Sequence, residues 1–119
     1  MEKIEKMLEI IVKTIDDRKG RDIVVFDTSA VNPLAKYSVI CDADNKRLCQ
    51  AIAHEIDNEL YDNGFEIHHI EGRQGGEWVL VDAKDVLIHI FQAGERIKYN
   101  LEKHWADQPQ IDISKYIEE

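Results

Sequence analysis

Trp78-Val-Leu-Val-Asp-Ala-Lys-Asp-Val-Leu-Ile-His-Ile-Phe91 is the segment that determines the architecture of this chain. Two apolar runs, 78–81 and 86–91, are joined by the short link 82–85, which predicts an antiparallel hairpin because a parallel crossover needs a much longer connection. Each run is apolar at both sets of alternating positions. A strand with one face in water would instead alternate apolar and polar residues. The second face of the hairpin must therefore be covered by the last helix or by a partner.

The chain upstream of the hairpin predicts two helices and two strands. Apolar residues recur at helical spacing over 4–15 and again over 48–60, so each segment forms an amphipathic helix. The β-branched run 22–27 and the run 37–41 are typical of buried strands. Residues 42–45 are rich in Asp and Asn and supply the cap of the second helix.

A short strand over 65–70 and a glycine-rich turn over 71–76 come before the hairpin, and one helix over 94–105 follows it. The predicted fold class is α/β, with a mixed five-stranded sheet and flanking helices. Residues 1–106 form a single domain. The charged segment 107–119 is predicted as a C-terminal tail with the features of a mobile segment.

The last predicted helix carries an unusual tyrosine. Ile97, Leu101 and Trp105 fall on one stripe of a continuous helix, whereas Tyr99 lies roughly 200° from Ile97 on the helical wheel. A tyrosine that faces away from the core, near Trp78 of the hairpin, has the composition of an interface hot spot. The alternative is a singly exposed tyrosine, which is common on protein surfaces.

The composition is that of a soluble globular protein with a formal net charge of -9. This acidity argues against direct DNA or RNA binding, and it favours a basic partner or serves solubility alone. The sequence predicts no membrane segment and no signal peptide, so we expect a cytoplasmic protein. Cys41 and Cys49 are interpreted as small buried hydrophobic residues in a reducing compartment.

No group of residues predicts catalysis. Asp42 and Asp44 resemble the paired carboxylates of nucleotidyltransferases, but the chain has no Gly-Ser phosphate loop, and Asp44 is better explained as a helix cap. His68 and His69 are adjacent on a predicted strand, so their side chains should point to opposite faces and not share a metal. His89 is interpreted as a hydrogen-bonded core or interface histidine. We therefore expect no catalytic residue, no metal site and no cofactor.

The segment 71–105 resembles the signature of the ribosome silencing factor, or Iojap-like, family. That signature runs E-G, W-x-L-x-D, V-x-x-H-x-F and R-x-x-Y-x-L-E-x-x-W. The residues that match it here are Glu71, Gly72, Trp78, Leu80, Asp82, Val86, His89, Phe91, Arg96, Tyr99, Leu101, Glu102 and Trp105. The chain departs from the family over 42–45, where many relatives carry a Ser/Gly/Asn-rich turn.

The resemblance implies a nucleotidyltransferase-like fold without the catalytic residues. It implies binding to the large ribosomal subunit through ribosomal protein fourteen, on the face that meets the small subunit. Occupancy there would block subunit joining and repress translation when nutrients are scarce. It also implies a homodimer. The residues expected to bind the partner are Trp78, Leu80, Asp82, His89, Phe91, Arg96, Tyr99 and Glu102.

Two other functions stay open on the sequence. A diverged nucleotidyltransferase would use Asp42 and Asp44 and would show a Mg²⁺-dependent rise in heat stability with nucleotide. The second is a homodimeric scaffold with no ribosomal role. It stays open because a self-complementary apolar patch looks the same in sequence as a patch that binds a different partner.

Overall fold

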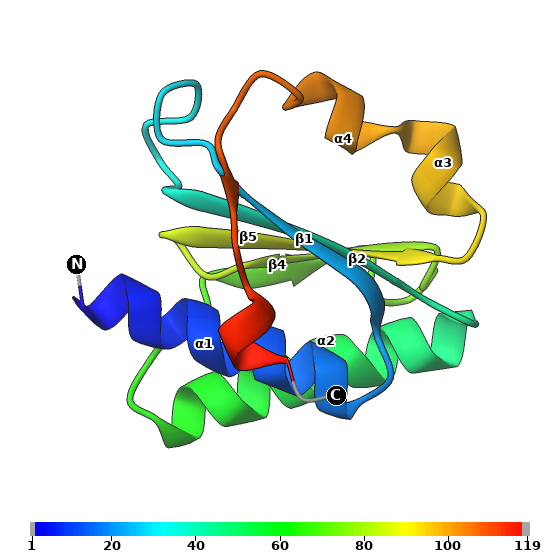
Figure 1. Cartoon of the computed structure of the whole chain (residues 1–119). Helices are drawn as coiled ribbons and strands as arrows, with labels where there is room; N and C mark the ends of the chain where they lie inside the picture. The colour runs from blue at the N-terminus through cyan, green and yellow to red at the C-terminus, as the bar shows by residue number, and fades with distance from the viewer. Residues whose placement is uncertain (1, 118–119) are drawn as a thin grey trace.

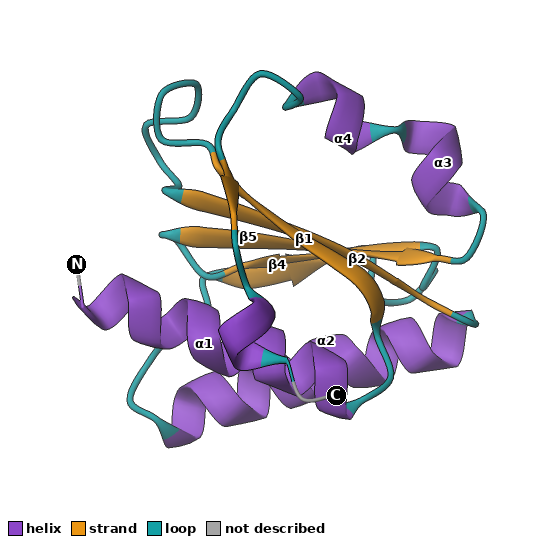
Figure 2. Cartoon of the chain, in the orientation of Figure 1, coloured by secondary structure: helices purple, strands orange, loops and turns teal. Residues whose placement is uncertain are grey.

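The computed structural model describes residues 2–117 and has three layers (Figure 1, Figure 2). A mixed sheet forms the middle layer. One of its faces is covered by two long helices, α1 (Glu2–Asp17) and α2 (Lys46–Asp62). Two short helices lie over the other face, α3 (Glu95–Tyr99) and α4 (Leu101–His104). Within the described residues, no helix has the length and apolarity to cross a bilayer.

Among the described residues the sheet has six strands, in the order β3-β4-β5-β2-β1-β6. Only the central pair β2–β5 is parallel, so the mixed sheet is confirmed. The predicted hairpin is confirmed as the antiparallel pair β4–β5. The strands are β1 (Arg21–Asp27), β2 (Tyr37–Ala43), β3 (His69–Glu71), β4 (Trp78–Asp82), β5 (Val86–Gln92) and β6 (Gln110–Ile111).

The predicted number of five strands is wrong because the segment 107–119 contains β6. Ile111 pairs with Val25 of β1, and Ile113 is buried against the core. A 3₁₀ turn at Ser114–Tyr116 follows and lies against α1. Residues 118–119 lie outside the described residues. The segment 110–117 is thus packed on the domain, whereas the sequence predicts a tail with the features of a mobile segment over 107–119.

The predicted strand 65–70 is also shorter than expected. Only His69 and Ile70 of that segment join β3, which continues to Glu71. Phe65 and Ile67 pack against the core from an irregular connection. Their alternating apolar pattern therefore reflects contact with the core and not ladder pairing.

The lower core lies between the long helices and the sheet. The apolar stripes of α1 and α2 are buried there, as the helical spacing predicts. Cys41 and Cys49 are free and buried in the same core. The helix cap differs from the prediction, because the Asn45 side chain accepts a hydrogen bond from the Leu48 N–H (2.8 Å). Asp44 is not the cap and forms an ion pair with Arg21.

The predicted helix 94–105 is broken into α3 and α4 at Asn100. This residue has φ 50° and ψ 50°, a left-handed conformation that Asn tolerates better than most residues. The break invalidates the helical wheel, which assumes a continuous helix. Ile97 is consequently 83% exposed, and Tyr99 lies on the sheet side, with its ring centroid 4.6 Å from that of Trp78.

Candidate functional site: the upper face of the sheet

The sheet face beneath α3 and α4, here called the upper face, carries most of the residues singled out in the sequence. In the β4–β5 ladder Trp78 is opposite Phe91 and Leu80 is opposite His89. Asp82 and Leu87 form the next pair on the same face. The alternate residues of both strands point into the lower core. The hairpin therefore packs against apolar residues on both sides of the sheet, which explains why both of its faces are apolar.

An aromatic cluster holds α3 and α4 on the upper face. The Trp78 ring lies 5.1 Å from Phe91 and 4.6 Å from Tyr99, measured between ring centroids. The Trp105 ring lies 6.1 Å from Phe26 and 5.6 Å from His89. Such pairs stabilise by about 0.5–1.5 kcal/mol each beyond the burial of their area. Tyr99 at the end of α3 and Trp105, which follows α4, thus attach this segment to the sheet.

His89 is buried in this cluster in the neutral form. Its Nδ1 accepts a hydrogen bond from the Trp78 indole N–H (3.2 Å), so the imidazole hydrogen belongs on Nε2. Among the described residues Nε2 has no hydrogen-bond partner. Burial lowers the pKa of His89 to about 4. His89 is thus a buried, hydrogen-bonded histidine, which fits the first of the two predicted roles, core or interface.

We expect the free energy of unfolding to fall by about 2–3 kcal/mol between pH 7 and pH 4 because of His89 alone. The folded pKa of about 4 lies below 6.5, the ordinary value of a histidine. The unfolded chain therefore takes up this proton first, and the stability present above pH 6.5 is lost as the pH falls through 4. Urea denaturation across this range measures the loss.

The variant His89→Gln isolates this contribution from carboxyl groups that titrate in the same range. Its stability should depend less steeply on pH than that of the wild-type protein, whatever its stability at pH 7. Equal pH dependence of the two proteins would contradict a neutral buried His89.

An ionic cluster fixes α3 at the other end of the upper face. Arg96 is 8% exposed and donates hydrogen bonds to Glu102 (2.8 Å) and Asp42 (3.3 Å). Burial acts to lower the pKa of Arg96, but the two carboxylates outweigh it and raise that pKa. Arg21 contacts Asp42 (3.2 Å) and Asp44 (2.7 Å). The paired aspartates are therefore engaged by guanidinium groups.

The structure places all eight predicted partner-binding residues around this face, but at different depths. Three of them are buried and cannot reach a partner in this conformation: His89, Phe91 and Arg96. Tyr99 is 44% exposed. The remaining four are half-buried: Trp78, Leu80, Asp82 and Glu102. The burial of these three favours a supporting position under the surface, and their role as direct contacts stays a prediction.

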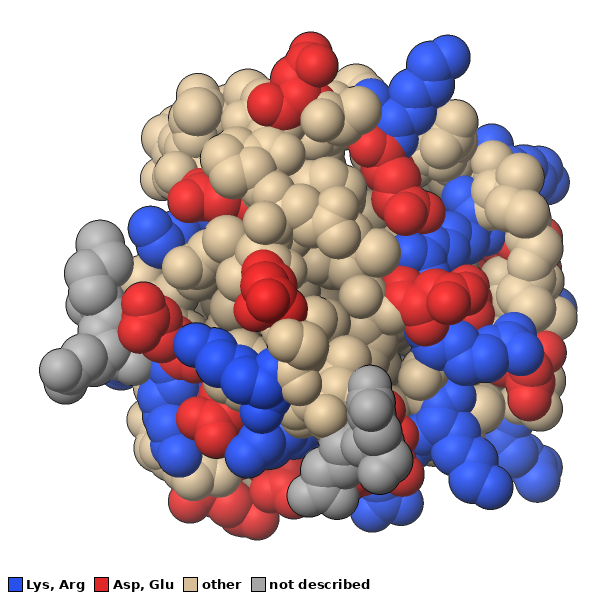
Figure 3. Space-filling model, viewed as in Figure 1, with Lys and Arg blue, Asp and Glu red and all other residues tan. Residues whose placement is uncertain are grey.

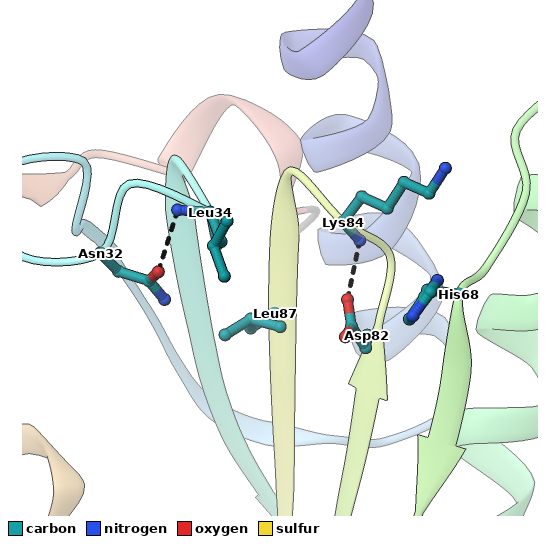
Figure 4. Close-up of a pocket in the computed structure, with 7 residues that line it drawn as sticks. Asn32, Leu34, His68, Asp82, Lys84 and Leu87 are labelled. Carbon is teal, nitrogen blue, oxygen red and sulfur yellow. Dashed lines mark hydrogen bonds between the residues drawn. The ribbon is translucent and has the colours of Figure 1, made fainter.

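A pocket that the sequence does not predict lies beside Asp82. It is open and has a volume of about 420 Å³. Figure 4 shows the side chains that line it. Its lining residues are Asn32, Leu34, Ala35, His68, Asp82, Lys84 and Leu87. Leu34 is 83% exposed there. A single leucine in a turn has no periodicity, so only the fold reveals that it adjoins Leu87.

The family model described as "Ribosomal silencing factor during starvation" matches residues 1–119. The chain belongs to the ribosomal silencing factor family. A ribosomal silencing factor of Bacillus subtilis is 38% identical over 109 residues, covering 92% of each chain. One from Halalkalibacterium halodurans is 34% identical over 113 residues, covering 95% of this chain and 97% of the relative.

Two solved structures agree with this membership. A crystal structure of a Chromobacterium violaceum protein has a TM-score of 0.84 at 33% identity, covering 87% of this chain and 86% of that one. A Bacillus halodurans protein has a TM-score of 0.81 at 33% identity, covering 92% and 99%. This silencing-factor chain therefore shares its architecture with proteins of known structure.

The Glu-Gly pair that resembles the start of the family signature has a structural reason in this chain. Gly72 has φ 75°, a conformation that favours glycine. A Cβ at this position would also collide with the Trp78 carbonyl oxygen. The glycine thus permits the close approach of the turn to the start of β4, which sets the position of Trp78.

Proposed function

We propose that this protein binds the large ribosomal subunit through ribosomal protein fourteen, on the face that meets the small subunit. By occupying that face it prevents subunit joining and represses translation under nutrient limitation. Family membership supports the ribosomal role. The observation that carries the proposal within this chain is the uncovered part of the upper face.

The short helices α3 and α4, with five and four residues, cover only part of the sheet. An apolar strip is left between and beside them, and we define it as Tyr99, Trp78, Leu80, Leu87 and Leu34. Tyr99 and Leu34 are exposed, and the other three are half-buried. An exposed apolar surface with an aromatic anchor and a polar rim is typical of a protein-binding site.

The charges around the strip favour a basic protein as the partner. The chain has a formal net charge of -9, and Asp82 and Glu102 lie half-buried at the rim. Opposite charges speed association and select the correct partner. Figure 3 shows acidic and basic side chains interspersed on the described part of one side of the molecule, with no continuous basic area there. A protein surface therefore fits better than bare RNA.

We infer that the protein acts by binding and not by catalysis, and that its fold is a nucleotidyltransferase-like one that has lost the catalytic residues. The support is local. Asp42 contacts both Arg21 and Arg96, and Asp44 contacts Arg21. Carboxylates that are neutralised in this way are poorly placed to hold the paired metal ions of a nucleotidyltransferase.

We also propose a cytoplasmic homodimer, whose contacts include the apolar strip if dimerisation and ribosome binding use the same surface. Self-association would bury the same side chains that the ribosomal partner needs. Dimer formation and subunit binding would then exclude each other, and the dimer would be a storage form.

Sedimentation of ribosomal subunits in a sucrose gradient tests the function directly. Purified large and small subunits are mixed at a Mg²⁺ concentration that permits joining, with and without the protein. We expect the protein to migrate with the large subunit and the joined peak to fall as the protein concentration rises. Small subunits alone serve as the control and should not carry the protein. Normal joining, with the protein left at the top of the gradient, would contradict the proposal.

A further inference from the structure

We propose that His68, His69 and Asp82 form a Zn²⁺ site at the end of β4, beside the apolar strip. One potential ligand atom from each residue lies within 4.8 Å of the other two. His69 is directly opposite Asp82 in the β3–β4 ladder, and the His68 N–H donates to the Asp82 carbonyl (2.7 Å). Both histidines are therefore anchored to the same residue.

The expectation that these histidines point to opposite faces is wrong. His68 precedes β3 and does not follow the alternation of a regular strand. Its ring lies 5.1 Å from that of His69, and Figure 4 shows it beside the Asp82 carboxylate. The neighbouring side chains thus meet on one side of the chain.

The Asp82 carboxylate is oriented for a ligand. Its Oδ1 accepts a hydrogen bond from the Lys84 N–H (2.9 Å), and its Oδ2 lies 3.7 Å from His69 Nδ1. That second distance is too long for a hydrogen bond. It is close to the separation of about 3.4 Å that two ligands of one tetrahedral zinc adopt, given bonds of about 2.0–2.1 Å.

Glu71, which lies on β3 with His69, places a second carboxylate beside the His69 ring. Its Oε1 lies 3.2 Å from His69 Nε2, so the His69 ring stands between two carboxylates. A neutral imidazole has one N–H, and when the hydrogen is on Nε2, the nitrogen nearer Glu71, the lone pair of Nδ1 is free to face Asp82. Metal-bound histidines commonly donate their other N–H to a carboxylate in this way. A cation between Nδ1 and Asp82 relieves the repulsion between two acceptors.

Two imidazole nitrogens and one carboxylate oxygen suit Zn²⁺ among the common divalent metals. Three protein ligands leave a fourth position for water. His68 and His69 are exposed and the adjacent pocket is open, so an ion can enter from solvent. The alternative cation is a proton on His69, which would make an ion pair with both carboxylates and bind no metal.

Isothermal titration calorimetry with ZnCl₂ tests the site, using chelator-treated protein without a polyhistidine tag. We expect one Zn²⁺ per chain and a rise in melting temperature with Zn²⁺. His69→Ala and Asp82→Asn should each weaken binding more than about tenfold, and Glu71→Gln should weaken it about tenfold while keeping the stoichiometry. His104→Ala is the matched control, since His104 is exposed on α4, and it should bind as the wild-type protein does.

Absence of binding heat in the wild-type protein would overturn the proposal and leave the protonated ion pair. Equal Zn²⁺ affinity of the wild-type protein and the double variant His68→Ala/His69→Ala would overturn it as well. Both histidines are exposed near an edge strand, so the double variant should keep its fold, which circular dichroism verifies. None of these measurements involves ribosomes, so their outcome is separable from that of the silencing function.

Discussion

Tyr99→Ala is expected to weaken binding to the large ribosomal subunit by about 30-fold or more, because a central aromatic anchor contributes about 2 kcal/mol or more to an interface. Tyr99 is the exposed aromatic residue of the apolar strip, 44% exposed. Its ring rests on Trp78 and Phe91, with centroids 4.6 and 5.9 Å away. This support holds the ring in place before binding, so little conformational entropy is lost in the complex.

Tyr61→Ala is the matched control for this experiment. Tyr61 is 75% exposed on α2, which lies on the opposite side of the sheet. Co-sedimentation at increasing protein concentration gives the dissociation constant of each variant. Tyr61→Ala should bind as the wild-type protein does. A Tyr99→Ala protein that is folded and binds with wild-type affinity would remove Tyr99 from the interface.

Trp78→Ala is expected to lower the free energy of unfolding by about 3 kcal/mol, as truncations of well-packed aromatic residues do. The indole contacts the rings of Phe91, Tyr99 and His89. Its N–H is also the hydrogen-bond donor to His89 Nδ1. Removing it leaves a cavity under α3 and leaves both nitrogens of His89 unpaired, which adds to the loss.

Denaturation by urea, followed by circular dichroism, measures this change. Trp78→Phe keeps a ring in the cluster but removes the N–H donor, so it should lose less, about 1–2 kcal/mol. Leu34→Ala, at an 83% exposed position, should change stability little. A Trp78→Ala protein as stable as Leu34→Ala would show that α3 and α4 are not packed on the sheet in solution.

The stability loss expected for Trp78→Ala changes the role that the sequence assigns to Trp78. From sequence, Trp78 is expected to bind the partner directly. In the structure it is a half-buried support of the upper face. A loss of ribosome binding in Trp78→Ala would therefore combine lost contact with lost packing, and Tyr99→Ala is the cleaner test.

The elements with strong periodicity could be predicted from the sequence. The hairpin 78–91 and the buried stripes of α1 and α2 appear where the apolar spacing places them. The strand β6 could not be predicted, because it has only two residues, Gln110 and Ile111, and two residues have no period. Its existence depends on pairing with β1, which is a tertiary contact.

The left-handed Asn100 is the source of the error about the orientation of Ile97 and Tyr99. The apolar spacing of Ile97, Leu101 and Trp105 is that of an unbroken helix, and nothing in it shows where the backbone turns. The contact of Arg96 with Asp42 was also beyond reach, since it joins residues far apart in sequence. The residue types of the site could be recognised from the sequence, but the extent to which each side chain is buried could not.

The central position of β5 has a consequence for how the protein is made. β5 lies between β4 and β2, and its parallel ladder with β2 joins residues 86–92 to residues 37–43. Until residue 92 has left the ribosome, β5 is not available to pair with β2 and β4, so the lower core cannot form. Long-range parallel pairing of this kind is slow to form. The nascent chain thus stays without its core until β5 has been synthesised, so folding is tied to the late part of translation.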